Sequence, residues 1–416
     1  MLSIEGTIIS QNRKSRGRIE IDQTSGLITK VSEPIGMADI ILKDEYIFPG
    51  FIDLHVHARE DMSHTQDYKE DFKTTGEAAI NGGVVFFAEM PNNPVPPIDD
   101  KTYEEKLELT KKSSVPVILY AGIGPSSKPL SKKVPYKVFM GPSVGELFFN
   151  SLAELEDVIR KYQGQNISFH CEDPEILEKY KNEPTHELKR PNETEISAVD
   201  FALYLIEKYN LSGKICHCST LAGLEKIIEA KKRGINVTVE ITPHHLYFDQ
   251  TMFDDELKKK LQVNPPIRQT KENRLALIKA LKDGVIDFLA TDHAPHTTDK
   301  KEKGISGMPH LDTYGAFATW LMKEHNFTPE DIARVCSYSP ACFMNQFSES
   351  RYGEIKAGAV GSLTIIDMKK PNEITKSKLK TKCGWSPFEG IILPGSVIIT
   401  IIKGKVYSSR IKISGN

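Results

Sequence analysis

The chain has 416 residues, of which 39% are hydrophobic, and its formal net charge is −2. This length is enough for one large domain and a smaller one, with a sizeable apolar core. The near-neutral charge gives no electrostatic basis for binding nucleic acid or an anionic membrane. No apolar run approaches the roughly 20 residues of a membrane span.

The N-terminus and the cysteines indicate a reducing compartment. The segment Met1–Gly6 lacks a basic region followed by an apolar one, so we expect no signal peptide. None of the six cysteines forms a Cys-x-x-Cys pair, and a chain of this length does not depend on disulfide bonds. We therefore expect a cytoplasmic protein.

Both ends of the chain are predicted to be rich in short β-strands. The runs are Ser3–Ser10, Arg18–Ile21 and Leu27–Val31 at one end, and Ser362–Asp367, Ser396–Lys403 and Lys405–Ser408 at the other. Turn residues separate them. Because the ends share this pattern and the middle differs, we predict that residues 1–48 and 352–416 together build one small β-sandwich domain.

In the middle of the chain, over residues 49–351, strand-like runs alternate with helical patterns. The runs are Phe51–His57, Val84–Met90, Val115–Ile123, Tyr136–Met140, Ile167–Cys171, Lys214–Cys218, Val237–Ile241 and Asp287–Thr291. The helical patterns between them include Tyr68–Asn81, Tyr103–Lys112, Leu152–Tyr162, Glu193–Tyr209, Leu221–Arg233 and Glu272–Leu281. This alternation predicts an α/β fold with a (β/α)8 TIM-type barrel. An open doubly wound sheet is the alternative, but no Gly-rich phosphate motif follows the first strand.

The first strand of the middle domain carries two histidines. Alternate side chains share one face of a strand, so His55 and His57 point the same way, and Arg59 continues that face. Two imidazoles on a rigid strand can be half of a metal site or two ordinary hydrogen-bonded histidines. The other ligands must come from elsewhere in the chain.

Polar residues recur where the barrel strands end, which is where catalytic residues lie in this fold. They are Asn92 after strand two, Lys137 within strand four, His170 in strand five, His217 in strand six, and Asp292 and His296 after strand eight. An unpaired ammonium buried in a strand costs on the order of several kcal/mol or loses its proton. Lys137 therefore needs either an ion-pair partner or a modification. The convergence of these residues on one rim favours a metal site.

The motifs that contain these residues occur in a fixed order. They are Pro49–Arg59, Met90–Asn92, Lys137–Met140, His170–Asp173, Arg190–Pro191, His217–Thr220, Pro243–Leu246, Val263–Arg268, Ala290–His296 and Ser386–Gly390. As an ordered set they resemble the dihydroorotases, in the cyclic amidase branch of the amidohydrolase superfamily. Some positions depart from the family pattern: Asp61-Met62 stand where Pro-Gly is usual, and His310 replaces a frequent glycine.

The resemblance implies a binuclear zinc site. His55 and His57 would bind one zinc ion together with Asp292, and His170 and His217 would bind the second. Lys137, carboxylated on its amine by carbon dioxide, would bridge the two. A carbamate replaces a cation with two carboxylate oxygens, which suits a pair of metal ions.

The resemblance also implies the reaction, which is the reversible cyclisation of N-carbamoyl-L-aspartate to L-dihydroorotate in pyrimidine biosynthesis. Two metal ions would lower the pKa of a bridging water. Asp292 would accept a proton from the nucleophile and pass it to the leaving nitrogen. The substrate-binding residues implied are Arg59, Asn92 and His296 for the carboxylate, and Asn264, Ser306 and Gly307 for the ring.

Two other functions remain open at this point. An allantoinase or another cyclic amidase, such as a hydantoinase, would use the same chemistry on another ring. An inactive dihydroorotase-like scaffold would keep the barrel and bind a partner enzyme, although such a chain would be expected to lose several ligands. Dimers are common in the family, so the resemblance makes a homodimer the candidate assembly.

Overall fold

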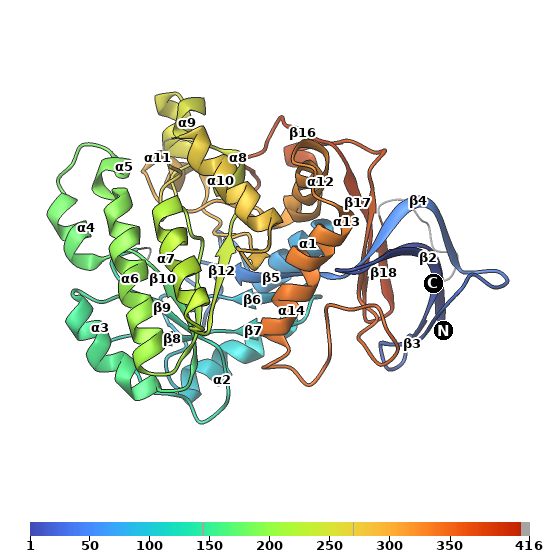
Figure 1. The fold of residues 1–416 in the computed structure, drawn as a ribbon, viewed down its shortest axis with the longest axis horizontal. Coiled ribbons are helices and arrows are strands. Elements are labelled where there is room, and N and C mark those ends of the chain that lie inside the picture. Colours follow the sequence, from blue (N-terminus) through green and yellow to red (C-terminus); the bar gives the residue numbers. More distant parts are fainter. Residues whose placement is uncertain (144, 269, 409–416) are drawn as a thin grey trace.

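The computed structural model describes residues 1–143, 145–268 and 270–408. Strands and helices of the middle of the chain form a barrel, and strands from both ends form a second unit beside it (Figure 1). In the described part of the chain, no helix is both long enough and apolar enough to cross a membrane.

The barrel is a closed ring of parallel strands. Three of them, β5 (Phe51–Val56), β6 (Val84–Glu89) and β7 (Val117–Leu119), form one sheet. Six others form a second sheet, namely β8 (Ala121–Ile123), β9 (Tyr136–Phe139), β10 (Asn166–His170), β11 (Ser212–Ile215), β12 (Val237–Ile241) and β13 (Phe288–Leu289). Only Tyr120 separates β7 from β8, so the two sheets share one bent strand. On the other side, Val56 pairs in parallel with His293, which closes the ring. The predicted (β/α)8 architecture is confirmed.

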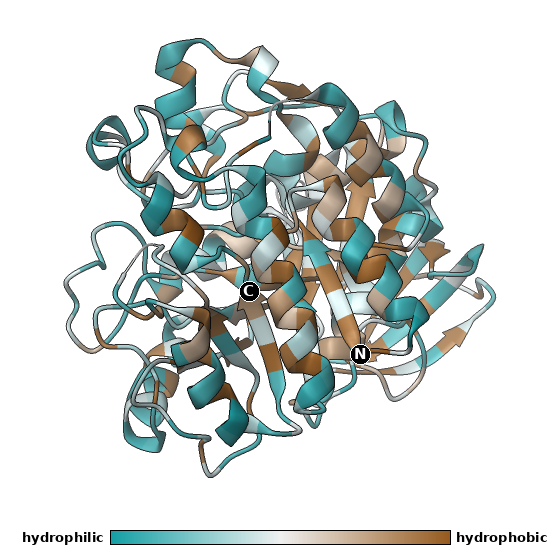
Figure 2. Cartoon of the chain, turned by 60° about the vertical axis from the view of Figure 1, so that its left-hand side comes forward, coloured by the Kyte–Doolittle hydropathy of each residue, from teal (hydrophilic) through white to brown (hydrophobic). Residues whose placement is uncertain are grey.

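Helices cover the outside of the barrel (Figure 1). The longer ones are α1 (Phe72–Asn81), α2 (Asp100–Leu109), α3 (Leu152–Ile159), α6 (Asn192–Lys208), α7 (Leu221–Lys232), α10 (Lys271–Lys282) and α12 (Tyr314–Glu324). The shorter ones are α4 (Pro174–Tyr180), α5 (His186–Lys189), α8 (Pro243–Tyr247), α9 (Asp255–Lys260), α11 (Thr298–Glu302), α13 (Pro329–Ala333) and α14 (Ser339–Met344). Figure 2 shows strands that are largely brown, and so apolar, behind helices with many teal, polar positions. Strands buried on both faces explain the nearly continuous apolar runs in the sequence.

One predicted helix was wrong at its start. The pattern over Tyr68–Asn81 predicted a helix four residues longer than α1. The helix begins later because Asp71 is its N-cap, and its side chain accepts a hydrogen bond from the backbone N–H of Thr74. The Thr74 side chain in turn binds the backbone of Asp71, which completes a capping box.

The second unit is a seven-stranded sheet built from both ends of the chain, in the order β18-β17-β14-β4-β1-β2-β3. The strands are β1 (Leu2–Ile9), β2 (Lys14–Asp22), β3 (Leu27–Ser32), β4 (Ile40–Pro49), β14 (Leu363–Asp367), β17 (Ser396–Ile402) and β18 (Lys405–Ser408). The junction of the two ends is β4 against β14, where Ile47 faces Ile365. Its buried isoleucines form a core separate from that of the barrel. A short hairpin, β15 (Asn372–Glu373) with β16 (Ile392–Leu393), lies between β14 and β17 in the chain.

This sheet confirms that both chain ends build the predicted β-sandwich. The sequence reading missed β4, in which Lys43, Asp44 and Glu45 interrupt the apolar pattern. The proposed boundaries of the two domains remain a prediction, and residues 409–416 of the segment 352–416 lie outside the described residues.

Candidate active site

A pocket opens where the barrel strands end. It is lined by His55, His57, Arg59, Asn92, Phe139, Ser143, His170, His217, Asn264, Asp292, Ala294, Ser306 and Gly307. His55 lies within β5 and His57 just after it, His170 is the last residue of β10, and His217 follows β11. The carboxyl ends of the parallel strands therefore bring these side chains to one rim.

Five of the six predicted metal-ligand side chains meet in this pocket. Oδ1 of Asp292 lies 3.1 Å from Nε2 of His57 and 3.3 Å from Nε2 of His55. Nδ1 of His170 lies 2.9 Å from Nε2 of His217. Ligand atoms of His55, His217 and Asp292 all lie within 4.8 Å of one another, so residues predicted to bind different ions belong to one compact cluster.

Three residues of the site have an unusual backbone conformation. The φ angles of Arg59, His217 and Asp292 are 64°, 35° and 48°. Residues other than glycine rarely adopt this left-handed backbone conformation, and such strain is often found at functional sites. Next to Asp292, the carboxylate of Asp53 on β5 accepts a hydrogen bond from the backbone N–H of Thr291 at 3.0 Å. This contact ties the end of β13 to β5.

Burial sets the protonation of these groups. It lowers the pKa of His55 to about 3 and holds the pKa values of His57, His170 and His217 below their usual value. The four imidazoles are therefore neutral near pH 7, which is the form that binds metals. Burial also raises the pKa of Asp292 to about 8. A nearby metal cation would favour its ionised form, so the donor set fits a metal site.

Lys137 lies below the pocket and does not line it. Its Nζ is 2.8 Å from Sγ of Cys216 and 5.2 Å from the ring centroid of Phe139. The side chain is fully buried. No carboxylate of the residues that the structure describes lies within 4.0 Å of this ammonium, so the ion-pair reading of Lys137 gains no support.

Five of the six predicted substrate-binding residues line this pocket, namely Arg59, Asn92, Asn264, Ser306 and Gly307. Oδ1 of Asn92 is 2.7 Å from Nδ1 of His57, so this residue also orients a predicted metal ligand. Oδ1 of Asn264 is buried without a hydrogen-bond partner among the described residues.

His296 is not among the pocket-lining residues. Its Nε2 lies 3.1 Å from Nη2 of Arg59. Its backbone carbonyl accepts a hydrogen bond from Nε1 of Trp385 at 2.7 Å. If His296 has a role in substrate binding, that role therefore includes orienting Arg59.

The sequence analysis assigned no role to several charged groups that contact the predicted metal ligands or pair with such a group. Glu240 and Lys214 lie in β12 and β11, and Glu240 contacts Nδ1 of His55. Glu172 contacts Nε2 of His170 at 2.9 Å and is paired with Arg190. The sequence does contain a pattern that indicates Glu240 and Lys214. Like Lys137, each is a charged residue inside an apolar strand and therefore needs a partner.

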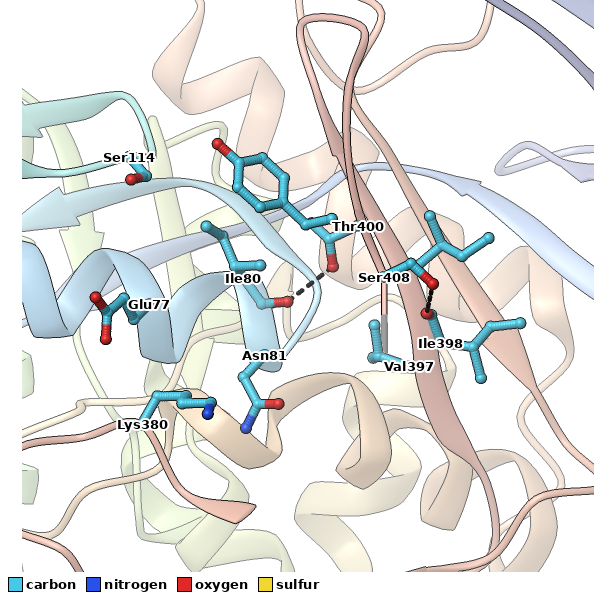
Figure 3. Close-up of a pocket in the computed structure, with 11 residues that line it drawn as sticks. Glu77, Ile80, Asn81, Ser114, Lys380, Val397, Ile398, Thr400 and Ser408 are labelled. Atoms are coloured by element: carbon cyan, nitrogen blue, oxygen red, sulfur yellow. Dashed lines mark hydrogen bonds between the residues drawn. The ribbon is translucent and has the colours of Figure 1, made fainter. Parts of the chain in front are cut away.

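Another pocket lies between α1 and the strands β17 and β18 (Figure 3). Across it, the Thr400 hydroxyl donates to the Ile80 carbonyl at 2.8 Å. Its lining has Glu77 and Lys380 but no histidine or cysteine among the described residues. It therefore lacks the ligand set that marks the pocket at the strand ends.

Comparisons with known proteins agree with this architecture. A model of the amidohydrolase family matches residues 46–407. Dihydroorotases from Pyrococcus furiosus and Thermococcus kodakarensis are 32% and 34% identical, over 99% and 97% of this chain and 94% of each relative. The structure of an L-hydantoinase (dihydropyrimidinase) from Arthrobacter aurescens superposes with a TM-score of 0.87 at 22% identity, covering 98% of this chain and 96% of that one, which supports the fold alone. The family model and the two relatives confirm the predicted resemblance: the chain belongs to the amidohydrolase family, and it matches dihydroorotases over nearly its full length.

Proposed function

We propose that the protein is a zinc-dependent dihydroorotase, which interconverts N-carbamoyl-L-aspartate and L-dihydroorotate in pyrimidine biosynthesis. The full-length relatives named above support this activity. The observation that carries the proposal is that the buried guanidinium of Arg59 lines the same pocket as four imidazoles and Asp292. A hydrolytic metal site beside an arginine that can bind a carboxylate matches a substrate that has both a cyclic amide and a carboxylate.

The residues that would hold the metals are those of the donor set. His55, His57 and Asp292 would bind one zinc ion, and His170 and His217 the other. When bound, the two ions supply an activated water and polarise the scissile carbonyl.

Lys137 would bridge the ions as a carbamate. Its neutral amine adds to carbon dioxide, forms one N–C bond and releases one proton. The structure offers an internal comparison, because Lys137 and Lys214 both pair with Ser168 in the strand register and are both fully buried. Lys214 has the Glu240 carboxylate at 2.6 Å, whereas Lys137 has no such partner among the described residues. This difference favours modification of Lys137.

Asp292 would carry the proton. Its carboxylate lies against His55 and His57 and lines the pocket, within reach of a nucleophile held there. It would accept the proton of the attacking water and then donate it to the leaving amide nitrogen. In the direction of ring closure the same carboxyl group would act in reverse order.

Arg59 would bind the substrate carboxylate. Burial lowers the pKa of Arg59 to about 10, so the guanidinium is still cationic at pH 7. Its planar fork can donate two parallel hydrogen bonds to a carboxylate. The buried Oδ1 of Asn264 would accept a hydrogen bond from a ring N–H.

The loop at Ser306 and Gly307 would lie against the ring. The φ angle of Gly307 is 129°, and a Cβ there would lie 2.6 Å from the carbonyl oxygen of Ala294. Only glycine allows the backbone at position 307 to come this close to Ala294, so this loop can form part of the pocket wall.

A panel of substrates tests the proposal. The purified, zinc-loaded protein should turn over N-carbamoyl-L-aspartate and L-dihydroorotate, and should act poorly on allantoin and hydantoin. A preference for allantoin or hydantoin would favour another cyclic amidase. Failure to bind zinc or to turn over any of these compounds would favour the inactive scaffold.

We further propose that the protein acts in the cytoplasm as a homodimer. Its partners would be its small-molecule substrates, with no nucleic-acid or membrane partner.

A further inference from the structure

A buried pair of opposite charges supports His55 from inside the barrel. Nδ1 of His55 hydrogen bonds to Oε1 of Glu240. Oε2 of the same carboxylate accepts a hydrogen bond from Nζ of Lys214 at 2.6 Å. The other ring nitrogen, Nε2, lies 3.3 Å from Asp292 in the pocket. The imidazole of His55 therefore joins the pocket to this charge pair.

Lys214 is held firmly in place. Its ammonium lies 3.4 Å from the carbonyl oxygen of Leu54. It also lies 5.2 Å from the ring centroid of Tyr120 and 5.4 Å from that of Phe343, which are cation–π distances. Neither Lys214 nor Glu240 lines the pocket, and both side chains are completely buried.

We propose that Glu240 and Lys214 are positioning residues that fix the ring and the tautomer of His55. An ionised carboxylate only accepts hydrogen bonds, so Glu240 places the ring proton on Nδ1. The lone pair of Nε2 is then directed into the pocket, where a metal can bind it. The hydrogen bond from Nζ of Lys214 to Oε2 fixes the orientation of the Glu240 carboxylate. The inference rests on the proposed function, because it treats Nε2 of His55 as a zinc ligand.

The same barrel provides a control pair of the same type, in which the side chains of Lys231 and Asp287 are 26% and 25% exposed. Asp287 accepts a hydrogen bond from Lys231 at 2.6 Å, the same length as the pair of Glu240 with Lys214. No hydrogen bond or ion pair joins Asp287 to an imidazole in the described part of the chain. Asp287→Asn therefore disrupts a lysine–carboxylate pair without disturbing His55.

Zinc affinity tests the proposal directly. Zinc is titrated against a chromophoric chelator into five metal-free proteins: the wild type, Glu240→Gln, Lys214→Met, Lys214→Arg and Asp287→Asn. Circular dichroism checks that each protein is folded. We expect Glu240→Gln and Lys214→Met to bind one of the two zinc ions about 10- to 100-fold more weakly. Lys214→Arg, which keeps the cation, should recover much of the affinity, and Asp287→Asn should match wild type.

Turnover gives a second readout. At limiting zinc, kcat should fall with the loss of affinity while KM changes little, because neither residue touches the pocket. If Glu240→Gln does not fold, the double variant Glu240→Gln/Lys214→Met, which removes both charges, replaces it. Wild-type zinc affinity in a folded Glu240 variant would overturn the inference. Failure of the wild-type protein to bind zinc would instead overturn the proposed function.

Discussion

Oδ1 of Asp292 lies 3.1 Å from Nε2 of His57, although the two residues are 235 positions apart in the chain. The contact exists because β5 and the segment after β13 are neighbours in the closed barrel, where His57 N–H donates to the His293 carbonyl at 2.8 Å. A carboxylate buried among neutral imidazoles is suited both to binding a cation and to moving a proton.

Replacing Asp292 should slow turnover strongly. Asp292→Asn keeps the shape of the side chain but removes its ability to take up a proton, so we expect kcat to fall about 10²- to 10⁴-fold. Steady-state kinetics with L-dihydroorotate measures the effect. Asp283→Asn, at an exposed ion pair with Lys279, is the control and should behave as wild type. An Asp292→Asn enzyme of near-normal kcat would rule out the proton-carrying role.

Replacing Lys137 should remove metal and activity together. Lys137→Ala deletes the proposed bridging carbamate, so zinc content and turnover are expected to fall in parallel. Carbon-13 NMR of protein equilibrated with labelled carbon dioxide should give a carbamate signal in wild type and none in Lys137→Ala. A variant that is fully loaded with zinc and active would exclude the bridge.

Replacing Arg59 should separate substrate binding from metal binding. Loss of a buried charge-assisted contact costs roughly 2–5 kcal/mol, so kcat/KM for L-dihydroorotate should fall more than about 30-fold in Arg59→Ala. Zinc content, measured by mass spectrometry, should stay near that of wild type. Arg59→Lys keeps the charge but not the planar fork, so its kcat/KM should lie between the values of wild type and Arg59→Ala. Unchanged turnover in Arg59→Ala would contradict the carboxylate assignment.

Metal removal should lower stability as well as activity. Ligands that bind only the folded state stabilise it, by about 2.7 kcal/mol per site at a free concentration of 100 Kd. A chelator should therefore lower Tm and abolish turnover, and added zinc should restore both. Equal Tm values with and without zinc would argue against a site formed by the folded barrel.

The sequence was sufficient to predict the barrel because its strands are buried on both faces and appear as separate apolar runs. It also predicted which side chains reach the rim, since polar residues that end parallel strands share one edge. His55, His57, His170, His217 and Asp292 all line the pocket, as this reasoning expected.

The partners of buried charges were harder to predict. Lys214 and Glu240 lie on adjacent strands, but strand spacing alone does not say which side chains point inward together. The contact of His296 with Arg59 and the contact of Asn92 with His57 depend on loop conformations that have no periodic sequence pattern. The start of α1 likewise depends on the local capping box between Asp71 and Thr74, which overrides the longer helical pattern.

The central claim is that side chains from five barrel strands surround two metal ions. Anomalous X-ray diffraction at the zinc edge, from crystals grown with zinc, tests it most directly. We predict two peaks in the pocket, one beside His55, His57 and Asp292 and the other beside His170 and His217, with density joining Nζ of Lys137 to both. A pocket without anomalous peaks at saturating zinc, or zinc bound only elsewhere on the protein, would contradict the account.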